Sequence, residues 1–204
     1  MTGLAGRLIA LEGGEGCGKS TQACLLADAL GAVLTREPGG TEAGERIRAL
    51  VLDPETGHLD PRTEALLVAA ARAQHVAEFI RPALEAGRIV VTDRYIGSSL
   101  AYQGFGRGLD VGDLRRLNEW ATSGLWPDLT ILLEVPQAIA AARLGPDRDR
   151  LEAETGGFHD RVMAGFAELA ATAQERWLVV DGAGPVEAVS ARVLAAVEGV
   201  LSVP

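Results

Sequence analysis

The sequence has little of several residue types on which common folds and sites depend. Only one of its 19 basic residues is a lysine, and the others are all arginine. Its two cysteines, Cys17 and Cys24, lie seven positions apart with no histidine close by, so they do not form a metal-binding pattern. A disulfide between them is not expected if Cys24 lies on a helix. The sequence therefore predicts two free thiols.

Long hydrophobic runs are also missing. The longest run, 65–71, is far too short to span a bilayer, and no charged segment followed by an apolar one opens the chain. We therefore expect no cleavable signal, no membrane partner and a cytoplasmic location. The net charge of −9 argues against broad electrostatic binding to nucleic acid. Anionic ligands would have to be attracted by a local cluster of arginines.

The length and the apolar pattern predict one α/β domain. With 204 residues and 48% hydrophobic content, the chain suits a single well-packed domain, 1–204, and is too short for two. The predicted strands are 7–12, 32–36, 88–93, 129–134 and 177–181. The predicted helices include 19–30, 41–52 and 62–86, and Pro82 can kink the last of these. Alternating strands and helices predict a five-stranded, mostly parallel sheet that is flanked by helices and binds ligands at the carboxyl ends of its strands.

The single lysine lies in a glycine-rich loop between the first predicted strand and the first predicted helix. The loop reads Gly13-Gly14-Glu15-Gly16-Cys17-Gly18-Lys19-Ser20, is followed by Thr21, and fits the pattern G-x-x-x-x-G-K-[ST]. In such a loop, backbone N–H groups surround phosphate oxygens, the lysine reaches the β- and γ-phosphates, and the serine hydroxyl ligates Mg²⁺. The strand–loop–helix order is the context that this motif requires. The sequence therefore predicts a site for a nucleoside triphosphate with Mg²⁺.

Asp93 and Arg94 follow each other at the end of the third predicted strand. A carboxylate at a strand end beside the phosphate loop can hold Mg²⁺, so Asp93 joins Ser20 as a predicted metal ligand. Arg94 would then grip a second, acceptor phosphate. For these two residues alone, an ion pair on the surface is the simpler interpretation. Their position beside the loop favours the functional one.

A segment at about 144–157, rich in Gly, Pro, Asp and Arg, predicts a mobile lid. Arg143, Arg148 and Arg150 lie in it or next to it. An arginine that a lid brings to a transferring phosphoryl group is worth roughly 10³–10⁵ in rate. The alternative interpretation is a charge-alternating loop that is simply solvated.

Further motifs, in order along the chain, resemble the thymidylate kinase family. They are Arg36-Glu37-Pro38-Gly39-Gly40-Thr41, Arg72-Ala73-Gln74-His75, Asp93-Arg94-Tyr95 with Ser98 and Ala101-Tyr102-Gln103-Gly104, Pro127-Asp128-Leu129-Thr130, and Asp149-Arg150-Leu151-Glu152. With the phosphate loop they extend over nearly the whole chain. The resemblance implies a three-layer P-loop kinase fold, phosphorylation of dTMP to dTDP by ATP and Mg²⁺ in dTTP biosynthesis, and a homodimer.

The loop and the resemblance together assign roles to individual residues. The expected catalytic residues are Lys19, Asp93, Arg94, Arg148 and Arg150. ATP is expected to contact the loop from Gly13 to Thr21, Arg143 and, beside the adenine, Ala183. The residues expected to contact dTMP are Glu15, Arg36, Arg48, Val68, Arg72, Arg94, Ser98, Ser99, Tyr102 and Gln103. Among them, Glu15 would accept a hydrogen bond from the sugar 3′-OH, and Tyr102 would disfavour a 2′-hydroxyl. His75 is expected to make a structural hydrogen bond rather than to catalyse.

Two positions that bear on specificity depart from the family pattern, and one of them is Ala71, where the family commonly has an acid. Val68 stands where the family usually has a phenylalanine that stacks on thymine. Loss of such a stack forfeits roughly 0.5–1.5 kcal/mol beyond area burial. The methyl group that separates dTMP from dUMP contributes only about 1 kcal/mol. A strict preference for thymine is therefore weakened.

A phosphate loop is compatible with other functions. A nucleoside or nucleoside monophosphate kinase with a different base preference stays open, as does a protein that binds ATP without turnover. A regulatory GTPase would need the guanine-reading pattern N-K-x-D. The only asparagine, Asn118, precedes Glu119, and the only lysine is in the loop, so this class is excluded.

Replacing Lys19 by arginine tests the loop directly. A narrow loop needs a compact ammonium group, whereas the planar guanidinium suits two oxygens side by side. We therefore expect Lys19→Arg to lose most of the phosphoryl-transfer activity, measured as ADP release at saturating substrates. Near-normal activity would mean that the single lysine reflects only the arginine bias of the composition.

Overall fold

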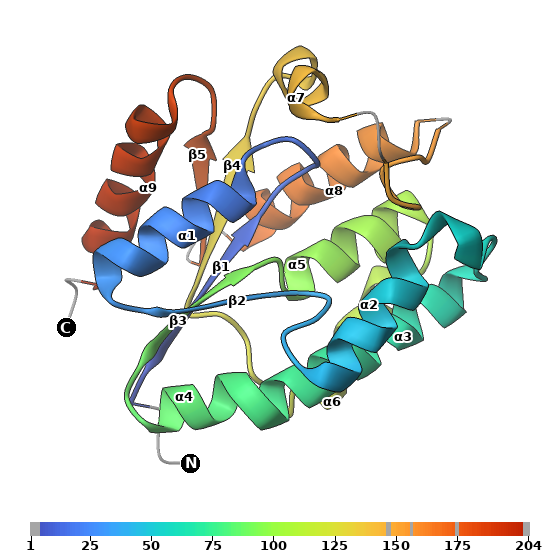
Figure 1. Cartoon of the computed structure of the whole chain (residues 1–204), viewed down its shortest axis with the longest axis horizontal. Coiled ribbons are helices and arrows are strands. Elements are labelled where there is room, and N and C mark those ends of the chain that lie inside the picture. The colour runs from blue at the N-terminus through green and yellow to red at the C-terminus, as the bar shows by residue number, and fades with distance from the viewer. Residues whose placement is uncertain (1–4, 146–147, 156, 174–175, 202–204) are drawn as a thin grey trace.

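Five parallel strands form a sheet at the centre of the molecule (Figure 1). The structure is a computed structural model and describes residues 5–145, 148–155, 157–173 and 176–201. The strands lie in the order β2-β3-β1-β4-β5. Their bounds are β1 Arg7–Glu12, β2 Val33–Arg36, β3 Ile89–Asp93, β4 Leu129–Glu134 and β5 Trp177–Asp181.

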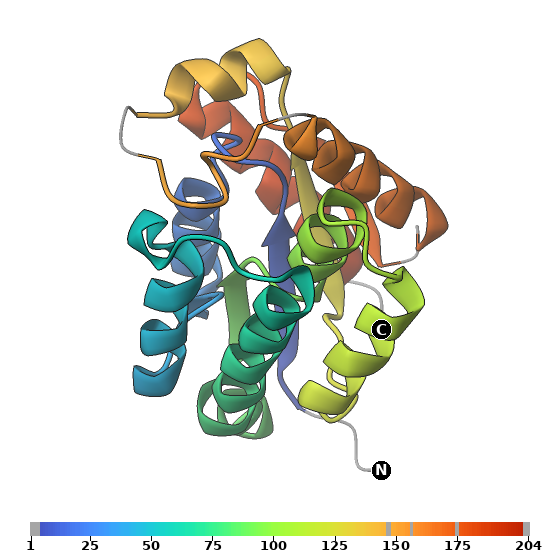
Figure 2. The same ribbon diagram turned by 90° about the vertical axis from the view of Figure 1, so that its right-hand side faces the viewer.

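Helices cover both faces of the sheet. Their bounds are α1 Lys19–Leu30, α2 Glu42–Leu52, α3 Pro61–His75, α4 Arg81–Glu85, α5 Ile96–Ser99, α6 Val111–Ala121, α7 Gln137–Arg143, α8 Phe158–Thr172 and α9 Val186–Leu201. Helices α1 and α9 lie on one face, and α4, α5 and α8 lie on the other (Figure 1). On the same side as α5, helices α2, α3 and α6 lie side by side at the outer surface (Figure 2).

The central strand β1 shows why the sheet is buried on both faces. Its side chains alternate, so Leu8 and Ala10 join the apolar cluster on the side of α3, α5 and α8. Ile9 and Leu11 join the cluster formed with α1 and α9. All four side chains are fully buried. A strand in a parallel sheet that is covered on both faces therefore needs the continuous apolar run seen in the sequence.

The predicted α/β fold class, five-stranded parallel sheet and flanking helices are confirmed. All five predicted strands are present, and two of them begin one residue later than expected, at Val33 and Ile89. The predicted lid at about 144–157 includes residues 146–147 and 156, which lie outside the described residues. No helix in the described ranges is both long enough and apolar enough to cross a membrane.

The long helix predicted at 62–86 is present but changes its winding before Pro82. Helix α3 leads into a π-helical segment, Val76–Ile80, and then into α4. Proline has no N–H to donate to the carbonyl four residues earlier, so the preceding turn widens into five-residue spacing. The N–H of Arg81 accordingly bonds to the carbonyl of Val76.

The carboxyl ends of the strands meet at one edge of the sheet. In the register of the parallel pairs, Asp93 at the end of β3 lies opposite Leu11 on β1 and opposite Arg36 at the end of β2. The phosphate loop starts directly after Glu12, the last residue of β1. The tertiary fold therefore brings the loop, Asp93 and Arg36 to the same edge, where open α/β sheets bind ligands.

The N-terminus of α3 supplies a test of how this helix is held. Asp60 Oδ1 accepts a hydrogen bond from Arg62 N at 2.9 Å, and Pro61 occupies the first helical turn. We expect Asp60→Ala to lower the free energy of unfolding by about 1 kcal/mol, because it removes this cap. Asp60→Asn keeps a side-chain acceptor, so its free energy of unfolding should fall much less in the same denaturant titration. Equal losses in the two variants would contradict the cap.

Candidate functional site

A cavity of about 1070 Å³ opens at the carboxyl edge of the sheet. It lies between the phosphate loop, the strand ends and helices α2 and α3. Lys19, Ser20 and Asp93 line it on the side of the loop. All ten residues expected to contact dTMP also line it: Glu15, Arg36, Arg48, Val68, Arg72, Arg94, Ser98, Ser99, Tyr102 and Gln103. The fold therefore brings residues from distant motifs into one space.

The phosphate loop leads directly into α1. Gly18 is the N-cap residue with φ 96°, a left-handed backbone that favours glycine. A side chain at Gly16 would collide with the carbonyl oxygen of Ala140, which precedes the end of α7. Lys19 is almost fully buried, and its Nζ donates to the carbonyl of Gly14 at 2.6 Å. The free N–H groups of this helix start and the ammonium group together suit a bound phosphate.

Ser20, in the first turn of α1, and Asp93, at the end of β3, are in contact. The hydroxyl of Ser20 donates to Asp93 Oδ2 at 2.5 Å. Asp93 Oδ1 is buried and has no hydrogen-bond partner among the described residues. An unpartnered buried carboxylate oxygen fits a cation ligand, because such an atom is costly to leave alone. In the described part of the chain, no three His, Cys, Asp or Glu side chains form a metal cage. Mg²⁺ sites that also use substrate phosphates need only one or two carboxylates.

Glu15 and Arg94 form a partly exposed ion pair in the wall of the cavity. Arg94 Nη2 donates to Glu15 Oε1 at 2.5 Å, and the hydroxyl of Tyr102 donates to the same oxygen at 2.6 Å. Burial by itself would raise the pKa of Glu15. The positive charges of Arg94 and Lys19, followed by the Tyr102 hydrogen bond, outweigh burial and bring that pKa to about 2. Glu15 is therefore ionised at neutral pH, and the pKa of Arg94 is raised in turn.

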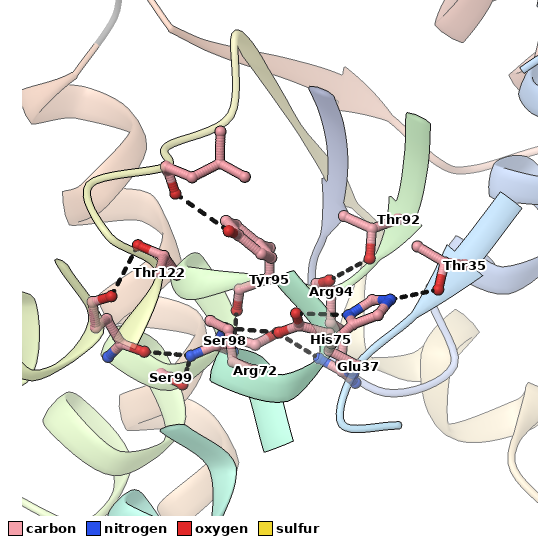
Figure 3. Close-up of polar contacts among 12 residues, drawn as sticks. Thr35, Glu37, Arg72, His75, Thr92, Arg94, Tyr95, Ser98, Ser99 and Thr122 are labelled. Carbon is pink, nitrogen blue, oxygen red and sulfur yellow. Dashed lines mark hydrogen bonds and ion pairs between the residues drawn. The ribbon is translucent and has the colours of Figure 1, made fainter. Parts of the chain in front are cut away.

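Arg72 lies at the centre of a buried hydrogen-bond network (Figure 3). Its Nε donates to Glu37 Oε2 at 2.6 Å, and its Nη2 donates to the carbonyl of Tyr95 at 2.9 Å. Its Nη1 donates to Ser99 Oγ at 2.8 Å and to Asn118 Oδ1. These contacts leave the guanidinium little freedom to turn, so it presents a fixed edge to the cavity.

His75 extends this network through Glu37 to Thr35 on β2 (Figure 3). Its Nδ1 lies 2.9 Å from Glu37 Oε1, and since a carboxylate only accepts, Nδ1 is the donor. Its Nε2 lies 2.6 Å from Thr35 Oγ1. His75 is fully buried, and these contacts fit the structural hydrogen bond expected for it.

The three arginines of the expected lid region lie in different surroundings. Arg143 reaches the carbonyls of Gly16 and Cys17, both at 3.4 Å. It also lies near the loop after β5, where its Nη2 is 3.5 Å from the carbonyl of Gly182, next to Ala183. Arg148 is exposed.

Arg150 is directed at helix α3 rather than at the phosphate loop. Its Nη2 donates to Glu64 Oε2 at 2.5 Å, and its Nε donates to the carbonyl of Val51 at 2.7 Å. Glu64 is fully buried and also accepts from Arg107 at 3.0 Å and from Gln103 at 2.9 Å. Arg150 therefore contacts the side of the cavity lined by Gln103.

Arg36 and Arg48 stand at the outer wall. Arg36 forms a half-exposed ion pair with Glu45 at 3.1 Å. Arg48 donates to the carbonyl of Pro38 at 2.9 Å. Burial, with the nearby charge of Arg36, lowers the pKa of Arg48 from its usual value. Both line the cavity, and the charge of Arg36 is paired with that of Glu45.

Sequence reasoning missed four buried polar residues of the site: Glu12, Glu37, Glu64 and Asn118. Two of them could have been recognised from their place in the sequence pattern. Glu12 is an acid at the end of an otherwise apolar strand, and Glu64 shares one helix face with Val68 and Arg72 at intervals of four. Asn118 had no comparable local signal, because its partner Arg72 lies on another helix.

The low pKa of Glu15 makes stability depend on pH. A glutamate titrates near 4.5 in the unfolded chain, so this group stabilises the folded chain above that pH and loses its effect as pH falls towards 2. We expect Glu15→Gln to reduce the free energy of unfolding by on the order of 3 kcal/mol near neutral pH, with a smaller reduction at about pH 3.5. Denaturant titrations at several pH values measure this difference.

The exposed pair of Glu42 and Arg46 on α2 offers a matched control, since both side chains are largely in solvent. Glu42→Gln should change stability little at any pH. If the effect of Glu15→Gln were constant with pH, the ion pair with Arg94 would not be the cause.

Comparisons with known proteins agree on one family. The family model for thymidylate kinase matches residues 11–193. Thymidylate kinase from Leifsonia xyli subsp. xyli is 53% identical over 206 residues, covering 97% of each chain. That from Clavibacter sepedonicus is 52% identical over 200 residues, covering 94% of each. A crystal structure of thymidylate kinase from Ehrlichia chaffeensis matches with a TM-score of 0.78 at 30% identity, covering 94% of this chain and 98% of that one.

The matches extend over the elements that build the cavity. The family model covers the chain from Leu11, near the end of β1, through the phosphate loop and into α9. The fold class agrees with the matched crystal structure over nearly the full length of both chains. This protein therefore belongs to the thymidylate kinase family, and its reaction is the phosphorylation of dTMP.

Proposed function

We propose that this chain transfers the γ-phosphoryl group of ATP to the phosphate of dTMP inside the cavity described above. The observation that carries the proposal is that all ten residues expected to contact dTMP line one cavity with Lys19, Ser20 and Asp93. The donor would lie on the phosphate loop, and the acceptor would lie towards α2 and α3. Holding both in one space removes much of the entropic cost of bringing two molecules together.

The acceptor nucleotide would be held by charged and polar groups at fixed positions. Arg94 would grip its phosphate, and Glu15, ionised at neutral pH, would accept from the 3′-OH. Tyr102 bonds to Glu15 at 2.6 Å, which supports its role in crowding a 2′-hydroxyl. Arg72 and Ser99, bonded to each other at 2.8 Å, would face the base edge.

The reaction needs positive charge more than a general base. Two anionic nucleotides repel each other, and the acceptor atom is already a phosphate oxygen. Lys19 would neutralise the β- and γ-phosphates, and Arg94 would neutralise the acceptor. His75 is fully buried away from this chemistry and has no step to perform.

Of the lid arginines, we assign the direct phosphoryl contact to Arg148. It is exposed, so it can approach a phosphoryl group without breaking a buried ion pair. Arg150 would first have to leave Glu64, so its proposed contribution to catalysis is a supporting one. On the donor side, Arg143 and Ala183 would flank the adenine.

Ser20 and Asp93 are the proposed Mg²⁺ ligands. The unpartnered Asp93 Oδ1 and the adjacent Ser20 hydroxyl support this assignment. When bound in such sites, Mg²⁺ neutralises charge on the β- and γ-phosphate oxygens.

The proposal includes a homodimer. Each chain would be a single domain, 1–204, with a lid at about 144–157. Helices α2, α3 and α6 are neighbours at the outer surface (Figure 2). Each exposes a large apolar side chain: Leu50, Leu66 and Trp120, the last 81% exposed. Exposed apolar side chains on adjacent elements are typical of protein interfaces. A cytoplasmic location fits the use of ATP and the free, exposed thiol of Cys24.

A panel of acceptors tests the function and its main alternative. We expect ADP release to be fastest with dTMP, slower with ribosyl TMP, and close to background with AMP and GMP. dUMP should be measurably slower than dTMP, but by no more than about tenfold, because a methyl group contributes little and Val68 offers no aromatic stack. Similar rates for dTMP and dUMP would favour a broader pyrimidine kinase. Turnover with AMP or GMP but not with dTMP would reject the proposal.

A further inference from the structure

Arg94 has an unusual backbone conformation for a residue with a side chain. Its φ is 69°, in the left-handed region, and among the non-glycine residues that the structure describes only Ser123 shares such a value. An arginine persists in this region only where surrounding contacts hold it. Its N–H donates to the carbonyl of Leu11 at 2.9 Å, and its carbonyl accepts from Thr92 Oγ1 at 2.8 Å. The contacts that hold the next residues decide whether this conformation is kept.

The carboxylate of Glu12 holds the backbone that follows Arg94. Its Oε1 accepts from Tyr95 N at 3.0 Å and from Ser98 N at 2.9 Å. These N–H groups belong to the start of α5, and the N-cap residue Tyr95 provides no side-chain cap of its own. Glu12, from the neighbouring strand β1, therefore does the work of a capping residue for the helix that begins just after Arg94.

Glu12 also reaches the guanidinium of Arg94 through one hydroxyl. Ser98 Oγ donates to Glu12 Oε2 at 2.6 Å. With its hydrogen used in that bond, the same oxygen accepts from Arg94 Nη1 at 3.0 Å. One carboxylate thus fixes both the backbone and the side chain of Arg94.

The surroundings of Glu12 leave it little freedom to move. The residue is fully buried, and a side chain at Gly97 would come within 2.7 Å of its Oε1. Burial raises the pKa of Glu12 to about 6, while the bonds from Ser98 and the charge of Arg94 act in the opposite direction. A buried acid opposes folding at neutral pH, so its presence beside Arg94 calls for a role beyond packing.

We propose that Glu12 is a positioning residue for phosphoryl transfer, which acts through Ser98 to keep the Arg94 guanidinium directed at the acceptor phosphate. The inference rests on the proposed role of Arg94. Glu12 itself touches neither nucleotide, so its effect must appear in how well Arg94 works.

Steady-state kinetics of Glu12→Gln, Ser98→Ala and the double variant test this chain of contacts. Either single change should raise the KM for dTMP by about tenfold, because it displaces the Arg94 guanidinium that would hold the acceptor phosphate. The KM for ATP should stay within about twofold of that of the unchanged protein. Both residues act through the same bond to Arg94. The KM for dTMP of the double variant should therefore be about that of the poorer single variant. If Glu12→Gln does not fold, Ser98→Ala still tests the contact with Arg94.

Val197→Ala is the matched control for a purely structural effect. Val197 is fully buried in the apolar cluster formed with α1 and α9, so the change lowers stability without touching Arg94 or its partners. It should leave both KM values unchanged. An unchanged KM for dTMP in Glu12→Gln and Ser98→Ala would overturn the inference, as would equal increases in the KM values for dTMP and ATP.

Arg94→Lys separates this inference from the proposed function. If Arg94→Lys raises the KM for dTMP and the Glu12 and Ser98 variants do not, the positioning role alone fails. If Arg94→Lys leaves dTMP kinetics unchanged, the assigned role of Arg94 fails, and the inference fails with it.

Discussion

The ion pair between Glu15 and Arg94 joins two segments that are far apart in the sequence. Glu15 belongs to the phosphate loop after β1, and Arg94 directly follows β3, the neighbouring strand. The same carboxylate oxygen also accepts from Tyr102. Removing either partner would take away the main opposite charge of the other in a site that is only partly exposed, which is costly. The loop, the end of β3 and the segment that carries Tyr102 therefore depend on one another for their positions.

Around this pair, the interior contains more charge than a protein core normally tolerates, and nearly all of it is paired. Arg72 gives hydrogen bonds to four different groups, and Glu37 accepts from both Arg72 and His75. Fully satisfied polar networks of this kind make a site rigid. A rigid site suits a reaction driven by electrostatic stabilisation, because its dipoles and charges do not need to reorganise when the phosphoryl group moves.

Local patterns in the sequence predicted most of the fold and much of the cavity wall. The apolar run of β1 and the glycine loop after it are local features, so the strand and α1 were predicted with the bounds that the structure has. The widened turn before Pro82 also follows from one residue. Glu12 and Glu64 were missed because their meaning comes from partners on other elements, Ser98 for one and Arg150 for the other.

The sequence by itself determined the chemistry of this protein: one lysine in a phosphate loop, an acid and an arginine after β3, and the motifs of the acceptor side. Those features depend on residues that are neighbours along the chain. Only the tertiary structure decided which of them meet. Parallel pairing of β1 with β3 brought Glu15 to Arg94, and the packing of the segment around Arg150 against α3 turned Arg150 towards Glu64. Contacts between distant segments are set by the packing of the whole sheet and its helices, so no local pattern could contain them.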